Sequence, residues 1–137
     1  MIQSSIGHLA YAIRSANAGF YKDLFTFLGW QVVYDDHGSV GLSGNHNVSL
    51  WFMAEAKPIQ NDYDGPGLNH LAISVSQAAD VDVAMQHLAQ QGISMLFDTP
   101  RHRPEFAPNP ASDYYQIMFE SPDRILFEIV YMGLKEA

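Results

Sequence analysis

Residues 69–75, with the sequence NHLAISV, decide the fold because they repeat residues 7–13, with the sequence GHLAYAI. The triplet His-Leu-Ala is identical in the two stretches and recurs after 62 residues. An apparent helix follows each stretch and ends at a glycine, Gly29 in the first case and Gly92 in the second, 63 residues apart. Because two landmarks recur at nearly the same spacing, the sequence indicates two copies of one supersecondary unit.

The two copies span about residues 1–56 and 67–133, and a linker over about residues 57–66 joins them. A chain of 137 residues has the length of one domain, so we expect both copies in a single domain, 1–137. In each copy the apolar pattern predicts a strand, a helix and then three strands. The predicted strands are residues 6–13, 30–34, 40–42 and 48–53, then 68–75, 94–97, 114–119 and 125–131; the predicted helices are residues 17–28 and 79–91.

The sequence also predicts which helix residues face inward and what one long loop does. The residues expected to face inward are Phe20, Leu24, Phe27 and Leu28 in the first helix, and Val83, Met85 and Leu88 in the second. Residues 98–113 form a longer loop than their counterpart and contain four prolines. Because long loops in compact domains are usually functional, we expect a movable lid here.

Charge and cysteine content exclude several classes of function. The chain has 7 Lys and Arg against 15 Asp and Glu, a formal net charge of −8, which repels nucleic acid. With no cysteine, disulfides, thiolate metal sites and cysteine nucleophiles are excluded. No apolar run reaches the roughly 18 residues of a membrane span, and the first residues lack the pattern of a signal peptide. We therefore expect a cytoplasmic protein that binds neither nucleic acid nor membranes.

Two histidines and one glutamate stand out on the predicted strands. Strand alternation places His8 and His70 on faces that otherwise carry small residues, which leaves a concave space. Glu128 lies inside the apolar stretch ILFEIVY, residues 125–131, where an unpaired carboxylate is costly. No Lys or Arg lies near it in the strand pattern, whereas a divalent metal ion would neutralise it.

The chain resembles, over almost its whole length, the vicinal oxygen chelate superfamily, which includes glyoxalase I, bleomycin-resistance proteins, type I extradiol dioxygenases and fosfomycin-resistance enzymes. The resemblance rests on the order of several motifs: the two His-Leu-Ala strands, FYKDL at residues 20–24 with Leu28-Gly29, FESPD at residues 119–123, and LFE at residues 126–128.

This resemblance implies an α+β fold, in which two paired βαβββ modules form a cup-shaped, partly open barrel-like sheet with helices outside. It also implies one divalent metal ion, held by His8, His70 and Glu128. Two imidazoles and one carboxylate suit Fe, Mn, Zn or Ni and leave positions open for a substrate with two neighbouring oxygens.

The reaction stays open because the chain differs from each named member. Glyoxalase I-like proteins supply a further carboxylate from the fourth strand, and residues 48–53 contain none. Extradiol and fosfomycin enzymes often have a tyrosine ten residues before the last ligand, where this chain has Met118. The turn at residues 121–124 is SPDR where the family usually has DPDG. Catalytic residues therefore stay unassigned.

Three functions remain open. The first is a metalloenzyme, a lyase or dioxygenase, in which the ion acts as a Lewis acid on a small substrate. The second is a metal-free protein of the bleomycin-resistance type that binds a cationic drug, which the net charge of −8 fits. The third is a scaffold without function. His37, His46 and His87 lie in predicted turns or on a polar helix face, and we do not expect them to bind metal.

Substrate contacts and assembly complete the expectations. Arg101, His102 and Arg103 form the one local basic cluster, which suits a small anionic ligand. Tyr114 and Met118 share a strand face with the expected cavity and are further candidates for substrate binding. Uncovered sheet edges favour pairing between chains, so we expect a homodimer.

Overall fold

The computed structural model describes residues 1–136, which divide into two compact units, residues 1–60 and 61–136. The division falls inside the predicted linker. Among the helices of residues 1–136, none has the length and apolar character needed to cross a membrane.

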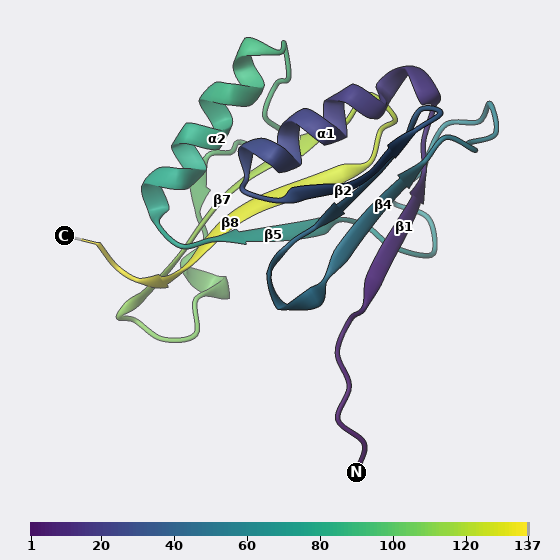
Figure 1. The fold of residues 1–137 in the computed structure, drawn as a ribbon. Coiled ribbons are helices and arrows are strands. Elements are labelled where there is room, and N and C mark those ends of the chain that lie inside the picture. Colours follow the sequence, from purple (N-terminus) through teal and green to yellow (C-terminus); the bar gives the residue numbers. More distant parts are fainter. Residues whose placement is uncertain (137) are drawn as a thin grey trace. The chain divides into compact units, whose positions relative to one another are not determined.

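The first unit is a four-stranded mixed sheet with one helix (Figure 1). The sheet has the order β1-β4-β3-β2; β1 runs parallel to β4, and the other pairs are antiparallel. Helix α1 ends before Gly29, whose φ of +92° is typical of a helix C-terminus closed by glycine. The elements are β1 (His8–Ala12), η1 (Ser15–Asn17), α1 (Ala18–Phe27), β2 (Gln31–Asp36), β3 (Ser39–Ser43), η2 (Asn45–Asn47) and β4 (Ser49–Met53).

Aromatic packing holds α1 against this sheet. The ring of Tyr21 stacks on that of Phe52 at 4.2 Å between centroids, and the Tyr11 ring stacks on Phe52 at 5.4 Å. Phe25 joins the same cluster at 5.7 Å. Because these large side chains occupy the helix-covered face, strand alternation leaves His8 on the opposite face.

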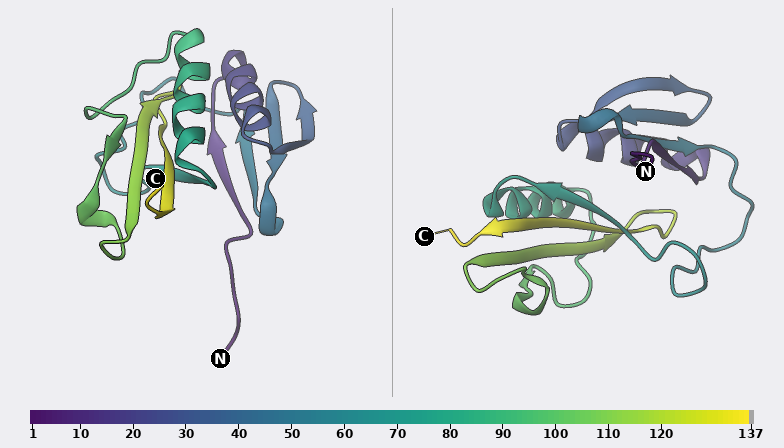
Figure 2. Two further views of the ribbon diagram at one scale, coloured as in Figure 1. Left: turned by 90° about the vertical axis from the view of Figure 1, so that its left-hand side faces the viewer. Right: turned by 90° about the horizontal axis from the view of Figure 1, so that it is seen from below.

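The second unit repeats this plan (Figure 1). Its sheet has the order β5-β8-β7-β6, with β5 parallel to β8 and the other pairs antiparallel. Helix α2 covers one face through its buried residues Val81, Ala84 and Leu88 (Figure 2). The elements are β5 (Leu71–Val75), α2 (Ala78–Gln90), β6 (Arg101–His102), η3 (Pro104–Phe106), β7 (Ser112–Glu120) and β8 (Leu126–Leu134).

The predicted α+β fold of two βαβββ units is confirmed, with one strand misplaced. Residues 94–97 do not form a strand, because Phe97 and Asp98 both have φ of +58° and turn the chain away after one backbone bond from Leu96 to Met118. The edge strand is β6 instead, which lies inside the loop predicted over residues 98–113. Part of the expected lid is therefore hydrogen-bonded into the sheet.

Candidate metal centre

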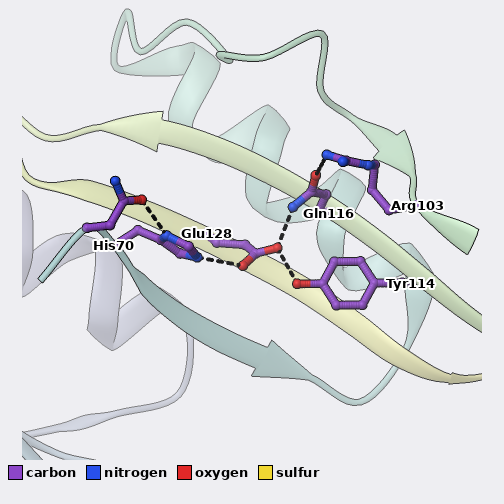
Figure 3. Close-up of polar contacts among 6 residues, drawn as sticks. His70, Arg103, Tyr114, Gln116 and Glu128 are labelled. Atoms are coloured by element: carbon purple, nitrogen blue, oxygen red, sulfur yellow. Dashed lines mark hydrogen bonds and ion pairs between the residues drawn. The ribbon is translucent and has the colours of Figure 1, made fainter. Parts of the chain in front are cut away.

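Glu128 lies near the start of β8, on the face of the second sheet away from α2. Tyr115 donates to Asp82 of α2 and pairs in register with Tyr131, so the odd-numbered residues of β8 face the helix. Glu128 alternates with them and therefore points to the other face (Figure 3). It is only 2% exposed. A charge buried this deeply requires polar partners.

Two uncharged donors bind one oxygen of this carboxylate. The Tyr114 hydroxyl donates to Glu128 Oε2 at 2.8 Å, and Gln116 Nε2 donates to the same oxygen. Arg103 Nη1 donates to Gln116 Oε1 at 3.4 Å and so holds that amide with its nitrogen toward the carboxylate (Figure 3). Burial, together with the bond to Glu128, raises the pKa of Tyr114 to about 12, so this hydroxyl keeps its proton at neutral pH.

The other oxygen of Glu128 faces a histidine. His70 Nε2 lies 3.3 Å from Glu128 Oε1, and the His70 side chain is 38% exposed. The second ring nitrogen, Nδ1, lies 2.8 Å from Asn69 Oδ1, and Asn69 Nδ2 donates to the backbone carbonyl of Tyr63 at 2.8 Å. His70 immediately precedes β5, which pairs with β8, and this pairing brings the two side chains together.

The spacing of this pair fits two ligands of one metal ion. Two ligand atoms that each lie about 2.1 Å from an ion, with an angle of about 100° between them, are about 3.2 Å apart. The observed 3.3 Å between His70 Nε2 and Glu128 Oε1 matches that spacing. Within the part of the chain that the structure describes, no three His, Asp or Glu side chains form a cluster. The second unit thus presents one nitrogen and one oxygen donor.

His8, the remaining predicted ligand, belongs to the first unit. It begins β1, pairs in register with Ser49 of β4 and is exposed. Within residues 1–60, no side-chain hydrogen bond or ion pair holds its ring.

Three predicted substrate-binding residues lie on the Glu128 face besides Tyr114. Met118 is the register partner of Glu128 on β7, and Arg101 is that of Gln116. The Arg103 guanidinium contacts Glu105 Oε1 through Nε at 2.5 Å and lies 4.5 Å from the centre of the Phe106 ring.

His102 has different surroundings. Its ring stacks on Tyr115 at 4.4 Å, and its Nδ1 lies 2.9 Å from Asp113 Oδ1. It lines a surface pocket of about 380 Å³ with Pro104, Ser112, Asp113, Lys135 and Glu136. Tyr115 faces α2, so His102 is separated from the Glu128 network.

Sequence reasoning did not single out Asn69 or Gln116 as partners of the candidate ligands. In the sequence Gln116 had only a weak signal, because it shares strand parity with Tyr114. Asn69 had a clearer one, since it immediately precedes His70 whereas glycine precedes His8.

The comparisons with known proteins identify the fold. No protein-family model matches the sequence, and no curated protein matches it. Among solved structures, a candidate glyoxalase from Bacillus halodurans is 23% identical, with a TM-score of 0.74 over 94% of this chain and 96% of that one. A glyoxylase/bleomycin resistance protein/dioxygenase domain from Frankia sp. is 20% identical, with a TM-score of 0.64 over 100% and 96%.

A third neighbour was solved with a metal. The fosfomycin resistance protein FosX from Listeria monocytogenes, complexed with Mn(II) and sulfate, is 17% identical, with a TM-score of 0.65 over 93% of this chain and 90% of that one. A variant of FosX was solved with Mn(II) and 1S,2S-dihydroxypropylphosphonic acid. These neighbours are glyoxalase, bleomycin-resistance, dioxygenase and fosfomycin-resistance proteins. This chain has the fold that they share, that of the vicinal oxygen chelate superfamily.

Proposed function

We propose that the protein is a divalent-metal-dependent enzyme of the vicinal oxygen chelate type, a lyase or dioxygenase that acts on a small substrate with two neighbouring oxygens. The observation that supports this most is the 3.3 Å between His70 Nε2 and Glu128 Oε1, together with the two donors on Oε2. His70 and Glu128 would hold the ion, and His8 is the proposed third ligand. When bound, Fe, Mn, Zn or Ni supplies Lewis-acid polarisation of the substrate oxygens.

The other residues of this face have supporting roles in the proposal. Tyr114 and Gln116 hold Glu128 with Oε2 occupied, so the carboxylate offers Oε1 as a single ligand atom. Arg101 and Arg103 would bind an anionic group of the substrate, because guanidinium suits carboxylate and phosphonate oxygens. Met118 would form part of the substrate wall. His102, which contacts Asp113 and Tyr115, is not part of this set.

Metal analysis tests the proposal. Protein purified without added metal is analysed for its elements, stripped, and titrated separately with Mn(II), Zn(II), Ni(II) and, under anaerobic conditions, Fe(II). We expect one ion per chain and loss of that binding in His70→Ala but not in the control His87→Ala. A chain that takes up none of the four ions excludes the metalloenzyme.

A metal-free drug-binding protein is the second candidate, favoured by the formal charge of −8. Such a protein would bind a cationic glycopeptide such as bleomycin with equal affinity in the presence and absence of chelator. Loss of binding on chelation would exclude this candidate.

We further propose that the protein is a cytoplasmic homodimer. Each sheet ends in two edge strands, β1 and β2 in the first unit and β5 and β6 in the second, and sheet edges that stay unpaired favour pairing between chains. Sedimentation at micromolar concentration tests assembly, and a monomer there would exclude the dimer.

A further inference from the structure

The amide of Asn69 can take only one orientation between its two neighbours. Its Nδ2 lies 2.8 Å from the backbone carbonyl oxygen of Tyr63, and a carbonyl oxygen only accepts hydrogen bonds. The NH₂ group must therefore face Tyr63, and Oδ1 must face His70 Nδ1 at 2.8 Å.

This orientation determines where the His70 ring carries its proton. An amide oxygen has no hydrogen to donate, so the bond to Asn69 requires a proton on Nδ1. A neutral imidazole has one N–H, and its other nitrogen is then an acceptor. In the neutral ring Nε2 therefore presents its lone pair to Glu128 Oε1, 3.3 Å away.

The opposite tautomer would close the site. With its proton on Nε2, the ring would donate directly to Glu128 Oε1, and both prospective metal donors would be occupied by each other. With the proton on Nδ1 this hydrogen bond to Glu128 is absent, and a lone pair of the ring faces a carboxylate oxygen. That juxtaposition becomes favourable when a cation, either a metal ion or a second proton on the ring, lies between the two atoms.

The second unit also anchors the carbonyl that holds Asn69. The Tyr63 ring is buried, its hydroxyl donates to Glu120 Oε1 at 2.5 Å, and the Arg124 guanidinium lies 5.5 Å from its centre. In the same segment, Asn61 Nδ2 donates to the Arg124 carbonyl at 3.0 Å. The acceptor for Asn69 is thus fixed by contacts that do not involve His70.

We infer that Asn69 is a positioning residue that keeps the neutral His70 ring protonated at Nδ1, so that Nε2 stays available to a divalent cation beside Glu128. The role toward the cation rests on the proposed function, whereas the tautomer itself does not. Partners of this kind fix the ring orientation of metal-binding histidines, and their loss weakens metal affinity by about 10–100-fold.

Nitrogen-15 NMR of histidine-labelled, metal-free protein tests the tautomer at a pH of about 8.5, where an ordinary imidazole is neutral. The His70 signals are identified by their loss in His70→Ala. We expect the proton on Nδ1 in the natural chain and in Asn69→Asp, which keeps an acceptor oxygen. We expect a shift toward Nε2–H in Asn69→Ala. Asn61→Ala, which alters the same segment without touching His70, should leave the signals unchanged.

Zn(II) titration of the same proteins gives the second measurement. Asn69→Ala should bind about 10–100-fold more weakly than the natural chain, and Asn61→Ala within about twofold of it. A natural chain with its proton on Nε2 overturns the inference whether or not zinc binds, as does an Asn69→Ala protein with unchanged tautomer. A natural chain that keeps the Nδ1 proton but binds no metal supports the tautomer assignment and overturns the proposed function.

Discussion

The two units have the same order of strands and helix, but the histidines at matching positions have different side-chain contacts. His70 lies between Asn69 and Glu128, and Glu128 is held in turn by Tyr114 and Gln116. His8, at the matching place in the first unit, has no side-chain partner within residues 1–60. The repeat therefore reproduces the backbone position of the histidine, while the hydrogen bonds that orient it come from residues outside the repeated triplet. Among the described residues, side-chain contacts within the same unit orient the histidine of the second unit but not that of the first.

The largest expected effect follows from removing the charge at the centre of the second network. Glu128→Gln should abolish metal binding, a loss beyond about 100-fold, because a neutral amide replaces the carboxylate ligand. The fold should stay intact, and the metal-free variant should melt at the same temperature or higher, since a buried charge has been removed. Calorimetric titration and thermal unfolding without metal measure both. Metal affinity equal to that of the natural chain would remove Glu128 from the site.

The two histidines give the most direct test of the comparison. His8→Ala and His70→Ala should each weaken metal binding severely, by at least about tenfold, because each removes an imidazole ligand. Their controls are His37→Ala, His46→Ala and His87→Ala, which should stay within about twofold of the natural chain. A His8→Ala protein with unchanged affinity would confine the site to the second unit.

A Gln116 variant tests how much the hydrogen bonds to Glu128 contribute to metal affinity and to stability. Gln116→Leu removes one of the two donors to Oε2 and should lower metal affinity by about 10-fold, the lower end of the effect expected for an outer partner of a metal ligand. The free energy of unfolding should fall by about 1–3 kcal/mol, because a buried carboxylate loses a hydrogen bond. Gln90→Leu makes the same change on an exposed turn of α2 and serves as the control. Equal effects of the two changes would mean that Gln116 does not support the carboxylate.

Tyr114 makes the network sensitive to alkaline pH. Its pKa in the folded protein is raised to about 12, above the ordinary value of about 10, so above pH 10 the unfolded chain loses this proton more readily than the folded one. Stability should therefore fall as the pH rises from about 10 through 12. Tyr115 shows the same rise through burial and its bond to Asp82, and Tyr11 of the first unit shows it through burial alone.

Urea unfolding across this pH range measures that loss. Tyr114→Phe should lose less stability between pH 10 and 12 than the natural chain, although it is less stable at neutral pH by about 1 kcal/mol, the contribution of a hydrogen bond. Tyr34→Phe, on an exposed strand of the first unit, is the control. If the natural chain and Tyr114→Phe lose the same stability between pH 10 and 12, Tyr114 is not a source of this pH dependence.

The repeat was sufficient to predict the order of the elements, and Leu24 and Leu88 are buried as expected, but other helix residues expected to face inward are not. Tyr21 and Phe25 pack inward in α1, whereas Phe27, expected to face inward, is 42% exposed. In α2, Val83 is 49% exposed and Ala84 is buried. In each helix more than one set of apolar residues has the helical spacing, and packing against the sheet determines which set is buried.

The candidate site likewise has a part that the sequence predicted and a part that tertiary contacts determine. Strand alternation and the family resemblance pointed to His70 and Glu128, because both rest on residue order along a strand. Asn69 and Gln116 escaped notice because their roles depend on how an amide is turned, and Tyr63 and Arg103 determine that orientation through tertiary contacts. A strand pattern indicates which face a side chain takes but not which atom of it faces a partner.

The smallest expected effect comes from making the two units alike at the residue before the histidine. In the first unit this residue is Gly7, and a Cβ added there would meet no atom within 4 Å, so Gly7→Asn should fold normally and change stability by no more than about 0.5 kcal/mol. The new amide would lack a counterpart of the Tyr63 carbonyl, because residues 1–6 are exposed and belong to no helix or strand. Without that anchor the amide can rotate, so we expect the His8 tautomer, measured by nitrogen-15 NMR, to stay as in the natural chain. A shift of the His8 proton to Nδ1 would show that an adjacent asparagine alone is enough, and that the Tyr63 carbonyl is not needed to orient His70.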